Sequence, residues 1–205
     1  MEKVLIFDFD GTIADSCDLI IQIISKYIPN FTKDRYKREI STYYSSGFVK
    51  SLFRIFYYEM HLFNKFHSVH QDINKEIVNA KPQLGLKSVL EKLASLDIDM
   101  YIISSNYKDN ILEFLDKYKM NFFKEVYGDG NIYHKSKTIR KIKQSYGKSI
   151  EIFYIGDEIR DIYAARKADV NEVGVTWGIN SKEEFQGFNT KNIIDSPEDL
   201  LKLIN

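Results

Sequence analysis

The first dozen residues constrain this 205-residue chain most, because they join a buried strand to a pair of carboxylates. The apolar run from Val4 to Phe7 is typical of a buried strand. Asp8 and Asp10 follow it two residues apart, and Gly11 permits a sharp turn directly afterwards. Open α/β sheets bind ligands at this end of their strands. A solvated turn would explain a lone Asp-x-Asp-Gly equally well, so the functional interpretation depends on matching groups downstream.

Composition excludes several classes of protein. The 29 Lys and Arg balance the 29 Asp and Glu, so the chain has no basic excess that would attract nucleic acid. The single cysteine, Cys17, excludes an intrachain disulfide framework and suits a reducing compartment, so we expect a cytoplasmic protein. Acidic residues interrupt the first apolar stretch, so it does not resemble a signal peptide. No apolar run approaches the ~20 residues of a membrane span. We therefore expect neither a nucleic-acid nor a membrane partner.

Hydrophobic periodicity divides the chain into two kinds of region. Residues 15–81 show helical spacing and no convincing strand. Pro82 marks a boundary, because the residue before a proline is disfavoured in a helix. Beyond it, strand patterns alternate with helices of ~10 residues, which is the signature of parallel βαβ units. We predict an α/β fold: a Rossmann-like parallel sheet flanked by helices, formed by residues 1–14 and 82–205, with an all-helical cap inserted at 15–81.

Polar residues end three of the predicted strands: Asp8, Ser104 and Asp157. The strands predicted after the boundary cover residues 99–103, 125–127, 151–155, 173–176 and 192–194. Parallel strands end on the same side of a sheet, so these three polar clusters must converge on one edge.

Carboxylates dominate that edge. Asp8, Asp10 and Asp157 converge there, with Asp161 nearby. Crowded carboxylates repel one another unless a cation lies among them. Hard oxygen ligands at an open, partly hydrated site suit Mg²⁺.

Anion donors are predicted at the same edge. Ser104, Ser105 and Asn106 offer hydroxyl, amide and backbone donors at a helix N-terminus, and Lys135 adds a positive charge. We favour Ser104 over Ser105 because it directly follows the strand, with Asn106 assisting. We favour Lys135 over Lys137 because the serine between them resembles a helix N-cap. A metal, anion donors and a lysine around an aspartate are the components of phosphoryl transfer.

The four clusters together, in order and spacing, resemble the haloacid dehalogenase superfamily of hydrolases, in its phosphoglycolate-phosphatase-like or β-phosphoglucomutase-like group. They are Asp8-Phe9-Asp10-Gly11-Thr12, Ile103-Ser104-Ser105-Asn106, Lys135, and Gly156-Asp157-Glu158-Ile159-Arg160-Asp161. The resemblance covers the whole chain, including a helical cap after the first motif.

The resemblance implies a role for each motif residue. Asp8 would be the nucleophile and a Mg²⁺ ligand, and Asp10 the general acid and base, with its backbone carbonyl also on the metal. Asp157 would complete the metal site. Ser104 and Lys135 would hold the phosphate. Asp161 would be a supporting carboxylate.

We therefore expect a Mg²⁺-dependent phosphatase that hydrolyses a small phosphorylated metabolite through an aspartyl-phosphate, as a monomer or homodimer. Two alternatives stay open: a phosphomutase on the same core, and a non-catalytic module that binds phosphate or a partner. A mutase needs cap groups for a second phosphate, and Lys50, Arg54 and Lys65 could serve, although basic residues on a helix are more often solvated. The apolar stripe from Val49 to Met60 is interpreted as packing between cap helices.

Overall fold

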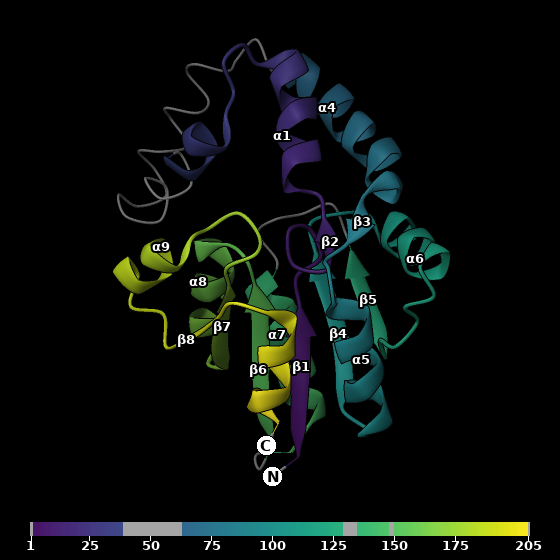
Figure 1. Cartoon of the computed structure of the whole chain (residues 1–205), viewed down its shortest axis with the longest axis vertical. Helices are drawn as coiled ribbons and strands as arrows, with labels where there is room; N and C mark the ends of the chain where they lie inside the picture. The colour runs from purple at the N-terminus through teal and green to yellow at the C-terminus, as the bar shows by residue number, and fades with distance from the viewer. Residues whose placement is uncertain (1, 39–62, 129–134, 148–149, 205) are drawn as a thin grey trace.

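A six-stranded parallel sheet forms the centre of the protein (Figure 1). The computed structural model describes residues 2–38, 63–128, 135–147 and 150–204. The strands, in their order across the sheet, are β5 (Glu125–Gly128), β4 (Asp99–Ser104), β1 (Lys3–Phe7), β6 (Glu151–Gly156), β7 (Asn171–Val175) and β8 (Asn192–Ile194). All five neighbouring pairs are parallel. The predicted α/β fold is confirmed, and the carboxyl end of β1 lies at the middle of the sheet edge.

Helices cover both faces of this sheet. Side chains of β1 alternate, so that Leu5 and Phe7 pack into the core on one face and Val4 and Ile6 into the core on the other. The first face is covered by α5 (Leu86–Ser95), α6 (Lys108–Lys117) and the 3₁₀-helix η2 (Pro197–Leu203), and the second by α7 (Lys135–Ser145) and α8 (Ile159–Ala168). Each of the four strand side chains is at most 1% exposed. Burial of such a side chain contributes roughly 1.5–3 kcal/mol, so the strand that carries the first motif is firmly anchored.

The flanking helices form because their apolar residues recur at helical spacing. In α5, Leu86, Val89, Leu90 and Leu93 lie on one face, and all four are buried against the sheet. Gly85 precedes the helix with a φ of 82°, a conformation that glycine adopts without strain.

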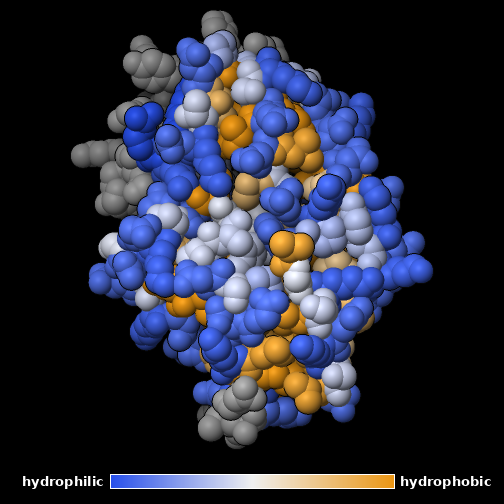
Figure 2. All heavy atoms as spheres, viewed as in Figure 1, coloured by the Kyte–Doolittle hydropathy of each residue, from blue (hydrophilic) through white to orange (hydrophobic). Residues whose placement is uncertain are grey.

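A second helical group lies above the carboxyl ends of the strands (Figure 1). It contains α1 (Cys17–Tyr27), a helical turn at 33–38, α4 (Phe63–Glu76) and the 3₁₀-helix η1 (Ile77–Asn79). Figure 2 shows apolar side chains gathered over α1 and α4. Two short strands, β2 (Ala14–Asp15) and β3 (Lys81–Pro82), pair antiparallel at the junction with the sheet. Our expectation of no strand in this region was therefore wrong at its two ends, because two-residue strands are too short to show a period.

Two further elements differ from the sequence analysis. An unpredicted helix, α9 (Lys182–Gly187), begins after Ser181, whose hydroxyl accepts a hydrogen bond from the backbone N–H of Glu184. The last helix, η2, has 3₁₀ geometry. The predicted stripe from Val49 to Met60 lies outside the described residues. Within the described ranges, no helix is long and apolar enough to cross a membrane.

Candidate active site

Asp8 directly follows β1 and is buried, with 1% of its surface exposed. The ammonium Nζ of Lys135 lies 2.8 Å from Oδ2 of Asp8 and 2.7 Å from Oδ1 of Asp161. Lys135 is itself buried, whereas Lys137 is exposed. Our reason for preferring Lys135 was wrong, because α7 begins at Lys135 and Ser136 is its buried second residue instead of its N-cap. The structure thus brings Lys135 between two carboxylates that are far apart in sequence.

The carboxylate of Asp157 is closely packed by two loops and accepts hydrogen bonds from both. The hydroxyl of Thr12 donates to its Oδ1 at 3.0 Å, and the N–H of Ile179 donates to its Oδ2 at 2.8 Å. A Cβ on Gly11 would lie 2.1 Å from Oδ2 of Asp157, and one on Gly178 would lie 2.3 Å from its Cβ. Gly11 also has a φ of 74°. Both positions therefore require glycine, because any side chain would displace the carboxylate.

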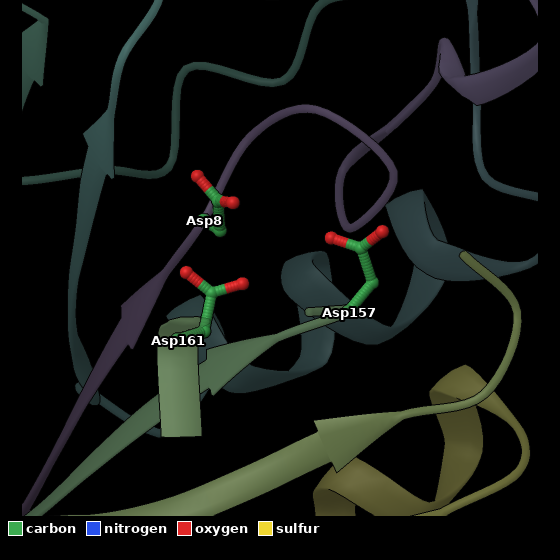
Figure 3. Close-up of side chains that lie close together, drawn as sticks. All are labelled: Asp8, Asp157 and Asp161. Atoms are coloured by element: carbon green, nitrogen blue, oxygen red, sulfur yellow. The ribbon is translucent and has the colours of Figure 1, made fainter. Parts of the chain in front are cut away.

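Asp8, Asp157 and Asp161 converge at the carboxyl edge of the sheet (Figure 3). One oxygen of each lies within 4.8 Å of the others. Burial, opposed by Lys135, raises the pKa of Asp8 to about 7, and burial with the neighbouring carboxylates raises that of Asp157 well above its usual range. Both oxygens of Asp161 already accept hydrogen bonds, Oδ1 from Lys135 and Oδ2 from the N–H of Glu158. Both oxygens of Asp157 are likewise engaged, by Thr12 and Ile179, so hydrogen bonds do not rank the three carboxylates. The cluster as a whole could hold a cation, and its hard oxygens fit Mg²⁺.

The side chain of Asp10 is not part of this three-carboxylate cluster and has hydrogen-bond partners of its own. Ser16 donates to its Oδ1 at 2.9 Å, and the amide of Asn106 approaches its Oδ2 at 3.4 Å. Burial raises the pKa of Asp10, although both of these contacts lower it. A raised pKa favours the protonated carboxyl group, which is the form that a general acid needs.

The second motif supplies hydroxyl and amide groups beside Asp10. Ser104 is the last residue of β4, because the strand runs one residue further than predicted. Its hydroxyl accepts a hydrogen bond from the backbone N–H of Asn106 at 2.9 Å. Ser104 and Asn106 are buried and Ser105 is half-buried. Ser105 and Asn106 line a cavity, and Ser104 does not. The structure therefore gathers Ser104 and Asn106 into a single turn next to the carboxylates.

A cavity of about 160 Å³ lies between the sheet edge and the helices above it. Asp10, Asn106 and Asp157 line it from the sheet edge. Isoleucines of α1 and α4 line it from above, namely Ile20, Ile21, Ile24 and Ile73. Asp10 and Asp157 thus border a small space with an apolar roof.

The helical turn at 33–38 reaches down to the sheet domain, a contact that the sequence analysis did not predict. Lys33 donates to the carbonyl of Gly178 at 3.1 Å, and the hydroxyl of Tyr36 donates to Oε2 of Glu158 at 3.0 Å. Lys37 pairs with Glu184 of α9 at 2.8 Å. Of these residues, Tyr36 and Glu158 line the cavity, so their contact forms part of its wall.

Three comparisons with known proteins bear on this geometry. The family model described as haloacid dehalogenase-like hydrolase matches residues 5–175. The chain belongs to this family. It is therefore an enzyme of the hydrolase class, and the family resemblance read from the four motifs is confirmed.

Curated relatives of this family match along the full chain. A phosphoglycolate phosphatase of Synechococcus elongatus is 26% identical over 98% of this chain and 97% of its own. The pyrophosphatase PpaX of Listeria welshimeri is 24% identical over 98% and 95%.

Solved structures of the family share the fold. A haloacid dehalogenase-like hydrolase from Bacteroides fragilis is 25% identical with a TM-score of 0.72, covering 98% of this chain and all of that one. A protein from Thermotoga maritima described as a β-phosphoglucomutase is 20% identical with a TM-score of 0.64, covering 100% of this chain and 98% of that one. At these identities the likeness supports the fold more than the substrate.

Several residues at the site escaped the sequence analysis. Glu158 and Arg160 stand inside the fourth motif, and the density of charge directly after a strand was a usable signal for both. Gly178 and Ile179 gave no such signal, because their role depends on a loop that returns to Asp157 from β7. Tyr36 belongs to no recognisable motif, so its contact with Glu158 could not be predicted from the sequence.

The raised pKa of Asp8 predicts how pH and metal affect stability. Between the unfolded pKa of 3.8 and the folded value of about 7, the native state holds more protons than the unfolded state. The free energy of unfolding of the metal-free protein should therefore fall as pH rises through this window. We expect the melting temperature in chelator to be lower at about pH 7.5 than at about pH 5.5.

Added Mg²⁺ should raise the melting temperature more at the higher pH, because it binds the ionised carboxylates and competes with protons. Differential scanning fluorimetry over a Mg²⁺ titration at both pH values measures this difference. Equal Mg²⁺-induced shifts at the two pH values would contradict the assignment of Asp8 to the metal site.

Proposed function

We propose that this protein is a Mg²⁺-dependent phosphatase that hydrolyses a small phosphorylated metabolite through a phosphoryl group carried on Asp8. The observation that best supports this is the placement of Asp8 beside Lys135 and Asp157, next to a cavity that Asp10 and Asp157 line. Fold alone would not support an activity. Relatives named as phosphatases add to the argument.

Asp8 is the nucleophile in this proposal. Its buried carboxylate attacks phosphorus while the bond from phosphorus to the leaving oxygen breaks. Lys135, at 2.8 Å, orients the carboxylate and favours its ionised form, and Asp161 fixes Lys135 from the other side. Ser104 and Asn106 supply donors to the phosphate oxygens. The charges are therefore placed before the substrate arrives, which is the main source of catalysis in phosphoryl transfer.

Asp10 moves the protons. Held by Ser16 and Asn106, its protonated carboxyl group donates to the departing oxygen in the first step. In the second step the resulting carboxylate accepts a proton from the water that attacks the phosphoryl group on Asp8. Products are the free alcohol and inorganic phosphate, and Asp8 is regenerated.

The residues that would hold Mg²⁺ are Asp8, Asp157 and the backbone carbonyl of Asp10. The ion, when bound, neutralises negative charge on the substrate phosphate and on the crowded carboxylates.

Residues 15–81 are proposed as a cap domain over the core formed by 1–14 and 82–205. The paired ends of this segment, β2 and β3, and the contacts of the turn at 33–38 support this division. A cap that closes over the cavity would exclude water during the first step. Of the cap cations suggested for a mutase, Lys50 and Arg54 lie outside the described residues, as does the side chain of Lys65, so no observation favours a mutase.

A panel of phosphate esters tests this function. We expect release of inorganic phosphate in the presence of Mg²⁺ and its loss in excess chelator, with restoration when Mg²⁺ is returned. The same reactions should be analysed for isomerised phosphate esters, which a phosphomutase would form. Isomerisation without phosphate release, or full activity in chelator, would overturn the proposal, and no turnover of any ester would favour a binding module.

A further inference from the structure

Arg160 is one of the residues that line the cavity. It occupies the first turn of α8, and its side chain is 13% exposed. Among the described residues that line the cavity, Arg160 alone carries a positive charge. The phosphorylation mechanism described above does not use it.

The guanidinium of Arg160 has hydrogen-bonding capacity to spare. One terminal nitrogen pairs with Oε1 of Glu158 at 2.5 Å. Its Nε is buried and has no hydrogen-bond partner within the part of the chain that the structure describes. An arginine carries five N–H donors, and buried donors are rarely left unpaired. A ligand that enters the cavity could satisfy this donor.

Glu158 holds the guanidinium in position. Its other oxygen, Oε2, accepts the hydroxyl of Tyr36, so a hydrogen-bonded chain runs from the cap through Glu158 to Arg160. A fixed guanidinium loses less conformational freedom when it binds an anion than a free one would.

The position of Arg160 relative to the reacting groups indicates which part of a substrate it meets. Burial raises the pKa values of Asp8 and Asp10, and the charge of Arg160 is among the influences that lower both. Arg160 therefore lies within electrostatic range of both carboxyl groups. It shares the cavity with Asp10, the proton donor to the leaving group, whereas Lys135, which contacts Asp8, does not line the cavity.

We propose that Arg160, oriented by Glu158 in the cavity beside Asp10, binds a second anionic group carried by the leaving group of the substrate. This inference rests on the proposed phosphatase function and specifies its substrate class: short phosphate esters or anhydrides with a carboxylate or a phosphate at the far end. The apolar roof formed by Ile20 and Ile24 suits a short leaving group with few hydroxyls.

The test compares esters that differ in the charge of the leaving group. We would measure kcat/KM of the wild-type protein and of Arg160→Met on an ester with a carboxylate at its far end, on pyrophosphate, and on a neutral alkyl phosphate. Arg160→Lys keeps the charge. Arg166→Met is the matched control, because Arg166 lies in the same helix but pairs with Glu172 outside the cavity.

We expect the wild type to prefer at least one anionic substrate over the neutral ester, and Arg160→Met to lower kcat/KM on that substrate by about 10–100-fold, the effect of a hydrogen bond to a charged group. On the neutral ester the loss should be a few-fold at most. Arg160→Lys should restore part of the preference, and Arg166→Met should leave it unchanged. The carboxylate and pyrophosphate arms then identify which anion Arg160 binds.

Misfolding would lower kcat/KM on all substrates alike and would leave the ratio of kcat/KM on the anionic and neutral substrates unchanged. A change in this ratio therefore distinguishes lost recognition from misfolding. An equal loss on neutral and anionic substrates would overturn the proposal, as would a wild-type protein with no preference. Turnover of the neutral ester by the wild type tests the phosphatase function separately, because that reaction does not depend on Arg160. If the wild type hydrolyses no substrate of the panel, both the function and this inference fail.

Discussion

Replacing Asp8 by Asn is expected to abolish phosphate release, with a loss of roughly 10⁴-fold or more, as for other residues that form a covalent intermediate. The amide keeps the shape of the side chain and removes its nucleophilic oxygen. Lys135 keeps Asp161 as a partner at 2.7 Å, so no buried ammonium is left unpaired. Because the carboxyl group of Asp8 has a pKa of about 7 in its buried position, a neutral amide there should not weaken the metal-free fold.

Steady-state phosphate release and the melting temperature should be measured on the same preparations of Asp8→Asn. Lys137→Met is the matched control, because Lys137 is the exposed lysine two residues after Lys135. Its turnover should equal that of the wild type. Comparable turnover by a folded Asp8→Asn variant would remove Asp8 from the role of nucleophile.

Replacing Asp10 by Asn should slow the first step in proportion to how much the leaving group needs a proton. General acid catalysis typically contributes ~10²–10⁴-fold, and we expect that loss with an alkyl phosphate. The leaving group of an aryl phosphate departs as a stabilised phenolate that needs no proton, so the loss of rate with this substrate should be far smaller. The Asn side chain can still contact Ser16 and Asn106, and the backbone carbonyl at position 10 is unchanged.

Single-turnover measurements isolate the first step for both substrates. The second step should slow for both, because each passes through the same phosphorylated Asp8 and needs the same general base. An equal slowing of the first step for alkyl and aryl phosphates would show that Asp10 is not the acid. Glu158, held at the cavity wall by Arg160 and Tyr36, would then be the next candidate.

The sheet was predictable from sequence because its strands combine strong apolar patterns with clear ends. Val4 to Phe7 and Ile152 to Ile155 are buried runs, the first followed directly by Asp8 and the second by Gly156 and Asp157. Parallel pairing then forces those ends together, whatever the details of packing. The convergence of the carboxylates therefore followed from topology alone.

Other parts of the site depend on contacts that leave no local pattern. The preference for Lys135 rested on a helix start at the wrong residue, and only its burial between Asp8 and Asp161 reveals its position. The two-residue strands β2 and β3 are too short for periodicity. Gly178 packs against Asp157 from a loop after β7, and a glycine in a loop is common for many reasons.

The phosphoryl group on Asp8 is the central claim, and trapping it is the most direct measurement. The protein should be mixed with an aryl phosphate and Mg²⁺, quenched in acid during turnover, digested and analysed by mass spectrometry. We predict one added phosphoryl group on the peptide that contains Asp8, a higher yield in Asp10→Asn because its second step is slower, and none in Asp8→Asn. Phosphate release without any phosphorylated peptide, or with the group on a different residue, would contradict the account.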